Sequence, residues 1–133
     1  MKRWWLIAGM AMLVPASAQA MTVEEFLVKA RALKAKGHDV TLLQGGISGD
    51  TTTGGLARLD WSVPDGTDAV LLELGANDML RGTDPKITYA NLDAMIRKLK
   101  ARKIAVMLFG MRSWSNAGPA YAEKFNAVFT DLA

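Results

Sequence analysis

The chain of 133 residues contains no cysteine and a single histidine, His38. Without cysteine the protein cannot form disulfides or bind a metal through thiolates, so an apolar core must supply its stability. One histidine also excludes the histidine clusters that hold zinc. We therefore expect no metal and no other cofactor.

Excess charge is also scarce, because 16 basic residues face 13 acidic ones and two of the basic residues, Lys2 and Arg3, lie at the N-terminus. A nucleic-acid surface requires clustered lysine and arginine, and no such cluster stands out here. The composition thus argues against a nucleic-acid partner.

The N-terminal region has the three parts of a secretory signal peptide. Lys2 and Arg3 form a positive head, residues 4–14 are mostly apolar but too few to span a bilayer as a helix, and Ala18-Gln19-Ala20 fits a cleavage site. The sequence therefore predicts a signal peptide over residues 1–20, cleavage after Ala20, and a periplasmic or secreted domain over residues 21–133. No stable membrane span would remain after cleavage.

From residue 22 onward, helical and strand-like patterns alternate. Apolar residues recur at helical spacing over residues 23–36 and 86–102, and a last helix is expected to begin near Pro119. Short apolar runs predict strands at residues 40–43, 69–74 and 104–109, and the last suits a parallel strand covered on both faces, with Met107 in the core. This order predicts an α/β fold with a parallel, doubly wound sheet.

The loops that follow the three predicted strands are the candidates for a functional site. They span residues 45–55, 75–82 and 110–118. In open α/β sheets, ligands bind outside the carboxyl ends of the strands, where all three loops would meet.

Two interpretations of the first two loops remain open at this point. Residues 45–55 combine glycines with small hydroxyl residues, but they lack the endings of known phosphate-binding loops. They fit either a ligand-binding loop or a tight strand-to-helix turn capped by Asp50 or Thr51. Asn77, in the second loop, fits either an oxyanion donor or a turn and helix-cap residue.

Taken together, residues 46–59 and 73–82 resemble the second and third sequence blocks of the SGNH, or GDSL, hydrolases. The most similar branch comprises bacterial periplasmic esterases with thioesterase, arylesterase and lysophospholipase activity. The resemblance implies a three-layer α/β/α, flavodoxin-like fold with a mostly parallel sheet. It also implies an oxyanion hole formed by the Gly49 backbone N–H and the Asn77 side-chain amide, and an ester, thioester or lysolipid as the small-molecule substrate.

The chain departs from that family in its first and last blocks. The block with the nucleophilic serine should precede the helix at residues 23–36, where the signal peptide lies instead, and the late Asp-x-x-His block is absent. The fold is therefore expected to be incomplete, without the first strand of the sheet. His38 precedes the strand at residues 40–43 and is expected to be an exposed residue far from the loops.

Three interpretations follow from this combination. The first is an incomplete or altered form of a secreted serine ester hydrolase. The second is an exported non-catalytic relative that binds a carboxylate, acyl or sugar ligand. The third is an enzyme with an unforeseen nucleophile, or a chain with no function. Trp114, in the third loop, either lines an acyl pocket or is an incidental loop aromatic.

Overall fold

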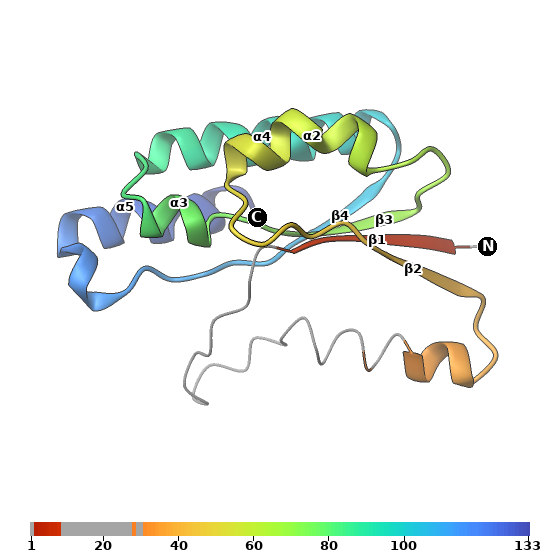
Figure 1. Ribbon diagram of the computed structural model, residues 1–133. Helices are drawn as coiled ribbons and strands as arrows, with labels where there is room; N and C mark the ends of the chain where they lie inside the picture. The colour runs from red at the N-terminus through yellow and green to blue at the C-terminus, as the bar shows by residue number, and fades with distance from the viewer. Residues whose placement is uncertain (1, 9–27, 29–30) are drawn as a thin grey trace.

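The computed structural model describes residues 2–8, 28 and 31–133. Its centre is a parallel four-stranded sheet in the order β2-β1-β3-β4. The strands are β1 (Lys2–Ala8), β2 (Val40–Gln44), β3 (Ala69–Glu73) and β4 (Ala105–Leu108). All three neighbouring pairs run parallel, so the carboxyl ends of the strands meet at one edge of the sheet (Figure 1).

Strand β1 lies inside the sheet, between β2 and β3. Trp4 is in register with Leu42 of β2 on one side and with Ala69 of β3 on the other. The expectation that the sheet lacks an inner strand here is therefore wrong for the full chain. Aromatic and branched residues at positions 4–7 suit a buried strand as well as the apolar part of a signal peptide, which is why the sequence pattern did not distinguish the two.

One face of the sheet is covered by helices α2 (Thr52–Ser62) and α4 (Pro85–Ala101) (Figure 1). Asp84 caps the N-terminus of α4, because its side chain accepts a hydrogen bond from the Lys86 N–H. Basic residues in the last turn of α4 complement the helix dipole. Alternate residues of β3 point toward these helices. The core on this face includes Leu59, Val70, Leu72, Leu74, Leu92, Met95 and Leu99.

Two shorter segments and a last helix follow at the carboxyl edge. They are α3 (Ala76–Leu80), the 3-10 turn η1 (Ser115–Ala117) and α5 (Pro119–Asp131). Helix α5 joins the core through Phe125, which stacks on Tyr121 and contacts the edge of Phe129. Helix α5 lies beside the loop that follows β3, since a Cβ on Gly75 would lie 3.2 Å from the Phe129 ring.

The opposite face of the sheet carries a helical segment at residues 31–35 (Figure 1). Strand β4 lies at the edge of the sheet, and Met107 is 51% exposed there. The predictions that this strand is covered on both faces and that Met107 is a core residue are wrong. A continuous apolar run does not reveal whether its strand lies inside a sheet or at its edge.

The remaining element predictions are confirmed, with small differences at the ends. The strands predicted at residues 40–43, 69–74 and 104–109 and the helices predicted at residues 86–102 and after Pro119 are all present. For the helix predicted at residues 23–36, residues 28 and 31–35 are helical and the other positions up to 30 lie outside the described residues. In the described part of the chain, no helix combines the length and apolarity needed to cross a bilayer.

Candidate oxyanion-binding site

The loop after β2 bends sharply at Gly49. The Asp50 N–H donates to the Ile47 carbonyl, and Gly49, at the third position of this turn, has a φ of +79°. A positive φ at that position favours glycine over residues with a side chain. The turn leaves Gly49 half-buried at the carboxyl edge of the sheet, as the sequence pattern predicted.

Arg58 of α2 forms hydrogen bonds with both ends of this loop. Its Nε donates to Asp50 Oδ2 at 2.7 Å, and its Nη1 donates to the Gly45 carbonyl at 2.8 Å. Both side chains of the ion pair are largely buried, with 7% and 11% exposed. The close approach of Asp50 to α2 requires Gly54, because a Cβ there would lie 2.0 Å from Asp50 Oδ1.

The same loop begins helix α2 through Thr51, whose side chain accepts from the Gly54 N–H. The helix-cap interpretation of this loop is therefore confirmed for Thr51, while the Asp50 carboxylate faces Arg58 and accepts from the Thr51 N–H. A capped strand-to-helix turn and a ligand-binding loop are compatible here, since the cap uses side-chain oxygens and leaves the Gly49 N–H uninvolved.

The loop after β3 brings Asn77 against the first loop. Asn77 Nδ2 donates to the Asp50 carbonyl at 2.8 Å. An amide nitrogen carries two protons, so one remains for a ligand. Among the described residues, the second Asn77 amide proton and the Gly49 N–H make no hydrogen bond.

Asp78 holds the second loop on its inner, buried side. Its carboxylate is fully buried and accepts from the Thr52 N–H at 2.8 Å, from the Thr52 hydroxyl, and from the Thr88 hydroxyl at 3.4 Å. Asn91 of α4 donates in turn to the Thr52 hydroxyl. These hydrogen bonds connect α2, α3 and α4 beneath Gly49 and Asn77.

Arg81 joins the two loops on the solvent side. It is the residue after α3, and its Nη2 donates to the Gly49 carbonyl at 3.1 Å. The structure thus brings Gly49 and Asn77 together and holds their loops by hydrogen bonds on the inner and outer sides. Sequence reasoning missed Arg58, Asp78 and Arg81 as the residues that arrange the two donors, since each of them is separated from its partner by a turn or a loop.

The prediction that His38 is exposed and far from the loops is confirmed. His38 lies before β2, at the opposite end of the strand from Gly49, and is exposed. In the described segments, no hydroxyl group makes a recorded hydrogen bond with this histidine. Trp114 is 43% exposed in the third loop.

Glu73 is the last residue of β3, directly before this site. Burial raises the pKa of its carboxyl group, and its buried Oε2 atom has no hydrogen-bond partner within the described part of the chain. The sequence showed it only as a polar interruption of an apolar run. At the described positions, no group of three or more potential metal ligands is present.

A family model for GDSL-like lipases and acylhydrolases matches residues 20–133. The chain belongs to this family.

Relatives within the GDSL-like family are esterases and thioesterases by name. An arylesterase of Vibrio mimicus is 45% identical over 103 residues, which are 77% of this chain and 52% of that protein. The thioesterase 1/protease 1/lysophospholipase L1 of Escherichia coli K12 is 37% identical over 94 residues, 70% of this chain and 45% of that protein. The chain thus spans about half the length of these relatives.

Solved structures of GDSL-like hydrolases confirm the fold. The crystal structure of AlinE4, described as an SGNH-hydrolase family esterase, matches with a TM-score of 0.79 and 31% identity. The match covers 100% of this chain and 71% of that one. The α/β SGNH-hydrolase fold predicted from the sequence is therefore confirmed, and the roles of Gly49 and Asn77 remain predictions.

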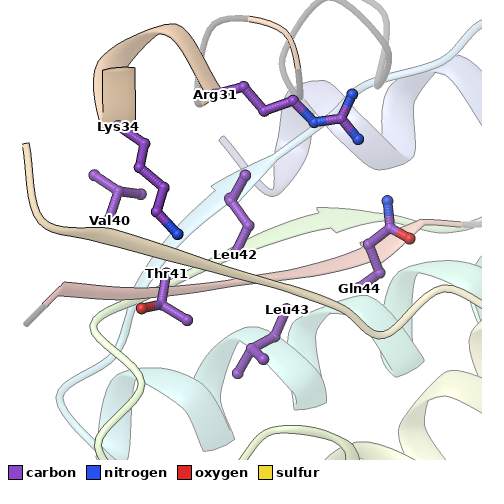
Figure 2. Close-up of a pocket in the computed structure, with 7 residues that line it drawn as sticks. All are labelled: Arg31, Lys34, Val40, Thr41, Leu42, Leu43 and Gln44. Carbon is purple, nitrogen blue, oxygen red and sulfur yellow. The ribbon is translucent and has the colours of Figure 1, made fainter. Parts of the chain in front are cut away.

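A separate hollow of about 490 Å³ lies between β2 and the helical segment at residues 31–35 (Figure 2). Arg31 and Lys34 of the helical segment extend over Leu42 and Gln44 of the strand. None of the residues of the oxyanion-binding site lines this hollow. It is therefore distinct from the site formed by Gly49 and Asn77.

Proposed function

We propose that this chain carries the oxyanion-binding part of an exported carboxylic ester hydrolase, with Gly49 and Asn77 as its two donors. The observation that carries the proposal is the contact of Asn77 with the Asp50 carbonyl, which brings the second donor to the loop of the first. The ester, thioester and lysolipid activities in the names of its relatives suggest acyl esters or thioesters as the substrate class.

In such a reaction, attack on the acyl carbon converts the carbonyl oxygen into an oxyanion. The Gly49 N–H and the second Asn77 amide proton would donate to that oxygen and stabilise the tetrahedral intermediate. Loss of one oxyanion donor lowers kcat by about 10²- to 10³-fold in known hydrolases. The attacking serine also needs a histidine or other base within hydrogen-bond reach, and His38 does not fit this role.

The position of His38 favours a second candidate function. Two hydrogen-bond donors can form a binding site for a carboxylate or an acyl group, and in the described part of the chain no hydroxyl is paired with His38 as nucleophile and base. The chain would then be an exported, non-catalytic relative that binds its ligand through the same two residues.

The proposal is tested by measuring the hydrolysis of nitrophenyl butyrate by the full chain and by its Asn77→Ala variant. Hydrolysis that falls by roughly 10²-fold or more in the variant would support the esterase function. Absence of hydrolysis together with butyrate binding that Asn77→Ala weakens would support the binding function. If the chain neither hydrolyses the ester nor binds butyrate, Gly49 and Asn77 do not form the proposed site.

Export is part of this proposal and is supported by the charged head, apolar run and Ala18-Gln19-Ala20 motif. Cleavage after Ala20 would remove β1, so in any one molecule Lys2–Ala8 serves either as a signal or as the inner strand. The intact mass of the protein in the periplasm of its host tests the point. A mass of residues 21–133 supports cleavage, and a full-length mass in the cytosol contradicts export.

A further inference from the structure

We propose that Arg81 makes the two-donor site selective for carboxylate anions over neutral acyl compounds of the same chain length. The inference rests on the proposed function, because it assumes that Gly49 and Asn77 donate to one ligand oxygen. It adds how strongly the site binds a charged carboxylate relative to a neutral acyl compound, which the two donors alone do not determine: an N–H group binds a neutral carbonyl oxygen as well as a carboxylate oxygen.

The position of Arg81 follows from its hydrogen bond to Gly49. Its Nη2 lies 3.1 Å from the Gly49 carbonyl oxygen. Within one residue the backbone nitrogen and oxygen are less than about 4 Å apart, so the guanidinium lies within about 7 Å of the Gly49 N–H. Arg81 also follows Asn77 by one helical turn at the end of α3. Its positive charge therefore lies near the Gly49 N–H, and its backbone lies one helical turn from Asn77.

Of the other charged groups around the two donors, Asp50 and Arg58 cancel, while the carboxyl groups of Asp78 and Glu73 remain. Asp50 forms an ion pair with Arg58, so this pair adds little net charge. The Asp78 carboxylate opposes Arg81, but it is buried and accepts hydrogen bonds from Thr52 and Thr88 on the inner side. Arg81 is exposed and has no ion-pair partner in the part of the chain that the structure describes.

A cation at this distance distinguishes a charged ligand from a neutral one by a measurable factor. Two unit charges about 7 Å apart attract weakly in water and several times more strongly at a protein surface. Because Arg81 is exposed, we expect its charge to change carboxylate affinity by about 3- to 10-fold and to leave a neutral ligand unaffected. The difference should shrink with added salt.

The experiment compares butyrate with butyramide, which is neutral, similar in shape and resistant to hydrolysis. Both are titrated into the full chain, and dissociation constants are followed from the amide signals of Gly49 and Asn77. The variants are Arg81→Gln, which removes the charge, and Arg81→Lys, which keeps it. Lys100→Gln is the matched control, since this exposed lysine lies on α4 and makes no contact with the site.

We expect Arg81→Gln to weaken butyrate binding by about 3- to 10-fold with butyramide unchanged, and Arg81→Lys to retain most of the preference. Lys100→Gln should change neither ligand. If Arg81→Gln weakens butyrate and butyramide binding equally, Arg81 only holds the loops. If it weakens neither, Arg81 has no part in binding. Each of these results overturns the inference while the proposed site stands. If wild-type protein binds neither ligand, the proposed function itself fails.

Thermal unfolding of each variant shows whether a change in binding reflects a change in folding. A loss of butyrate affinity in Arg81→Gln at an unchanged melting temperature, restored by Arg81→Lys, supports the charge effect. If Arg81→Gln is unfolded, Arg81→Lys alone decides: a retained preference for butyrate supports the inference, and an equal affinity for butyrate and butyramide overturns it.

Discussion

Asn77 Nδ2 donates to the backbone carbonyl of Asp50 at 2.8 Å, across 27 positions of sequence. This hydrogen bond joins the loop after β2 to the loop after β3. It directs one proton of the amide toward the protein and leaves the other for a ligand. The proposed oxyanion-binding site depends on this contact.

Asn77→Ala should destabilise the protein only slightly. The substitution removes one half-buried hydrogen bond, which contributes about 0.5–1.5 kcal/mol to the free energy of unfolding. Chemical denaturation measures this change. A loss above about 3 kcal/mol would show that Asn77 is chiefly a structural residue, since this exceeds what one such hydrogen bond supplies.

Asp78→Ala should be much more damaging than Asn77→Ala. The buried carboxylate accepts from the Thr52 N–H and from two threonine hydroxyls, and its removal leaves these donors unsatisfied at about 1–3 kcal/mol each. Asp60→Ala is the control, because its ion pair with Lys98 is exposed and adds little to stability. Similar melting temperatures for the two variants would contradict the anchoring role of Asp78.

Gly54→Ala should disrupt the first loop without adding any polar group. The new Cβ would lie 2.0 Å from Asp50 Oδ1, so the Asp50 carboxylate must move away from Arg58. Gly110→Ala is the matched control, because its Cβ would meet Phe129 at an ordinary 3.5 Å. We expect lower stability and weaker butyrate binding for Gly54→Ala alone. Equal behaviour of the two variants would count against the described packing.

Removal of residues 1–20 should sharply lower the stability of the chain. Strand β1 pairs with β2 and β3, and its loss would leave backbone groups on both neighbours unpaired at a cost of about 1–3 kcal/mol for each buried group. Hydrogen exchange of β2 and β3 amides in chains 1–133 and 21–133 tests this. Equal protection in both chains would show that β1 does not stabilise the sheet.

Glu73 should make stability fall as pH rises. Burial raises its pKa in the folded state above the ordinary value of 4.5 for a glutamate, so between the unfolded and folded pKa values the native chain holds a proton that the unfolded chain has lost. Stability from this group is therefore greatest below pH 4.5 and declines above it. Glu73→Gln should remove this decline, whereas the exposed Glu123→Gln should not. Thermal unfolding across this pH range measures the slope.

The sequence predicted the architecture well because its signals are local. The apolar run at residues 69–74 and the helical periodicity at residues 86–102 identify β3 and α4 without knowledge of their neighbours. The inner position of β1 and the exposed edge of β4 could not be predicted in this way. Both depend on which strands are neighbours, and an apolar run has the same composition in either place.

The same limit applies to the candidate site. Gly49 and Asn77 could be selected because each follows a strand and fits a block of a known family. The groups that arrange them, Arg58, Asp78 and Arg81, act through hydrogen bonds to residues 8 to 32 positions away. Such pairings become visible only when the two loops are seen side by side in the folded chain.

The most direct test of the account is a titration of the full chain with butyrate, followed by two-dimensional nitrogen–proton NMR. The account predicts that the backbone signal of Gly49 and the side-chain amide signal of Asn77 shift together, with one dissociation constant, because both donate to the same oxygen. Shifts confined to other residues, or different dissociation constants for the two signals, would contradict the claim that Gly49 and Asn77 form a single oxyanion-binding site.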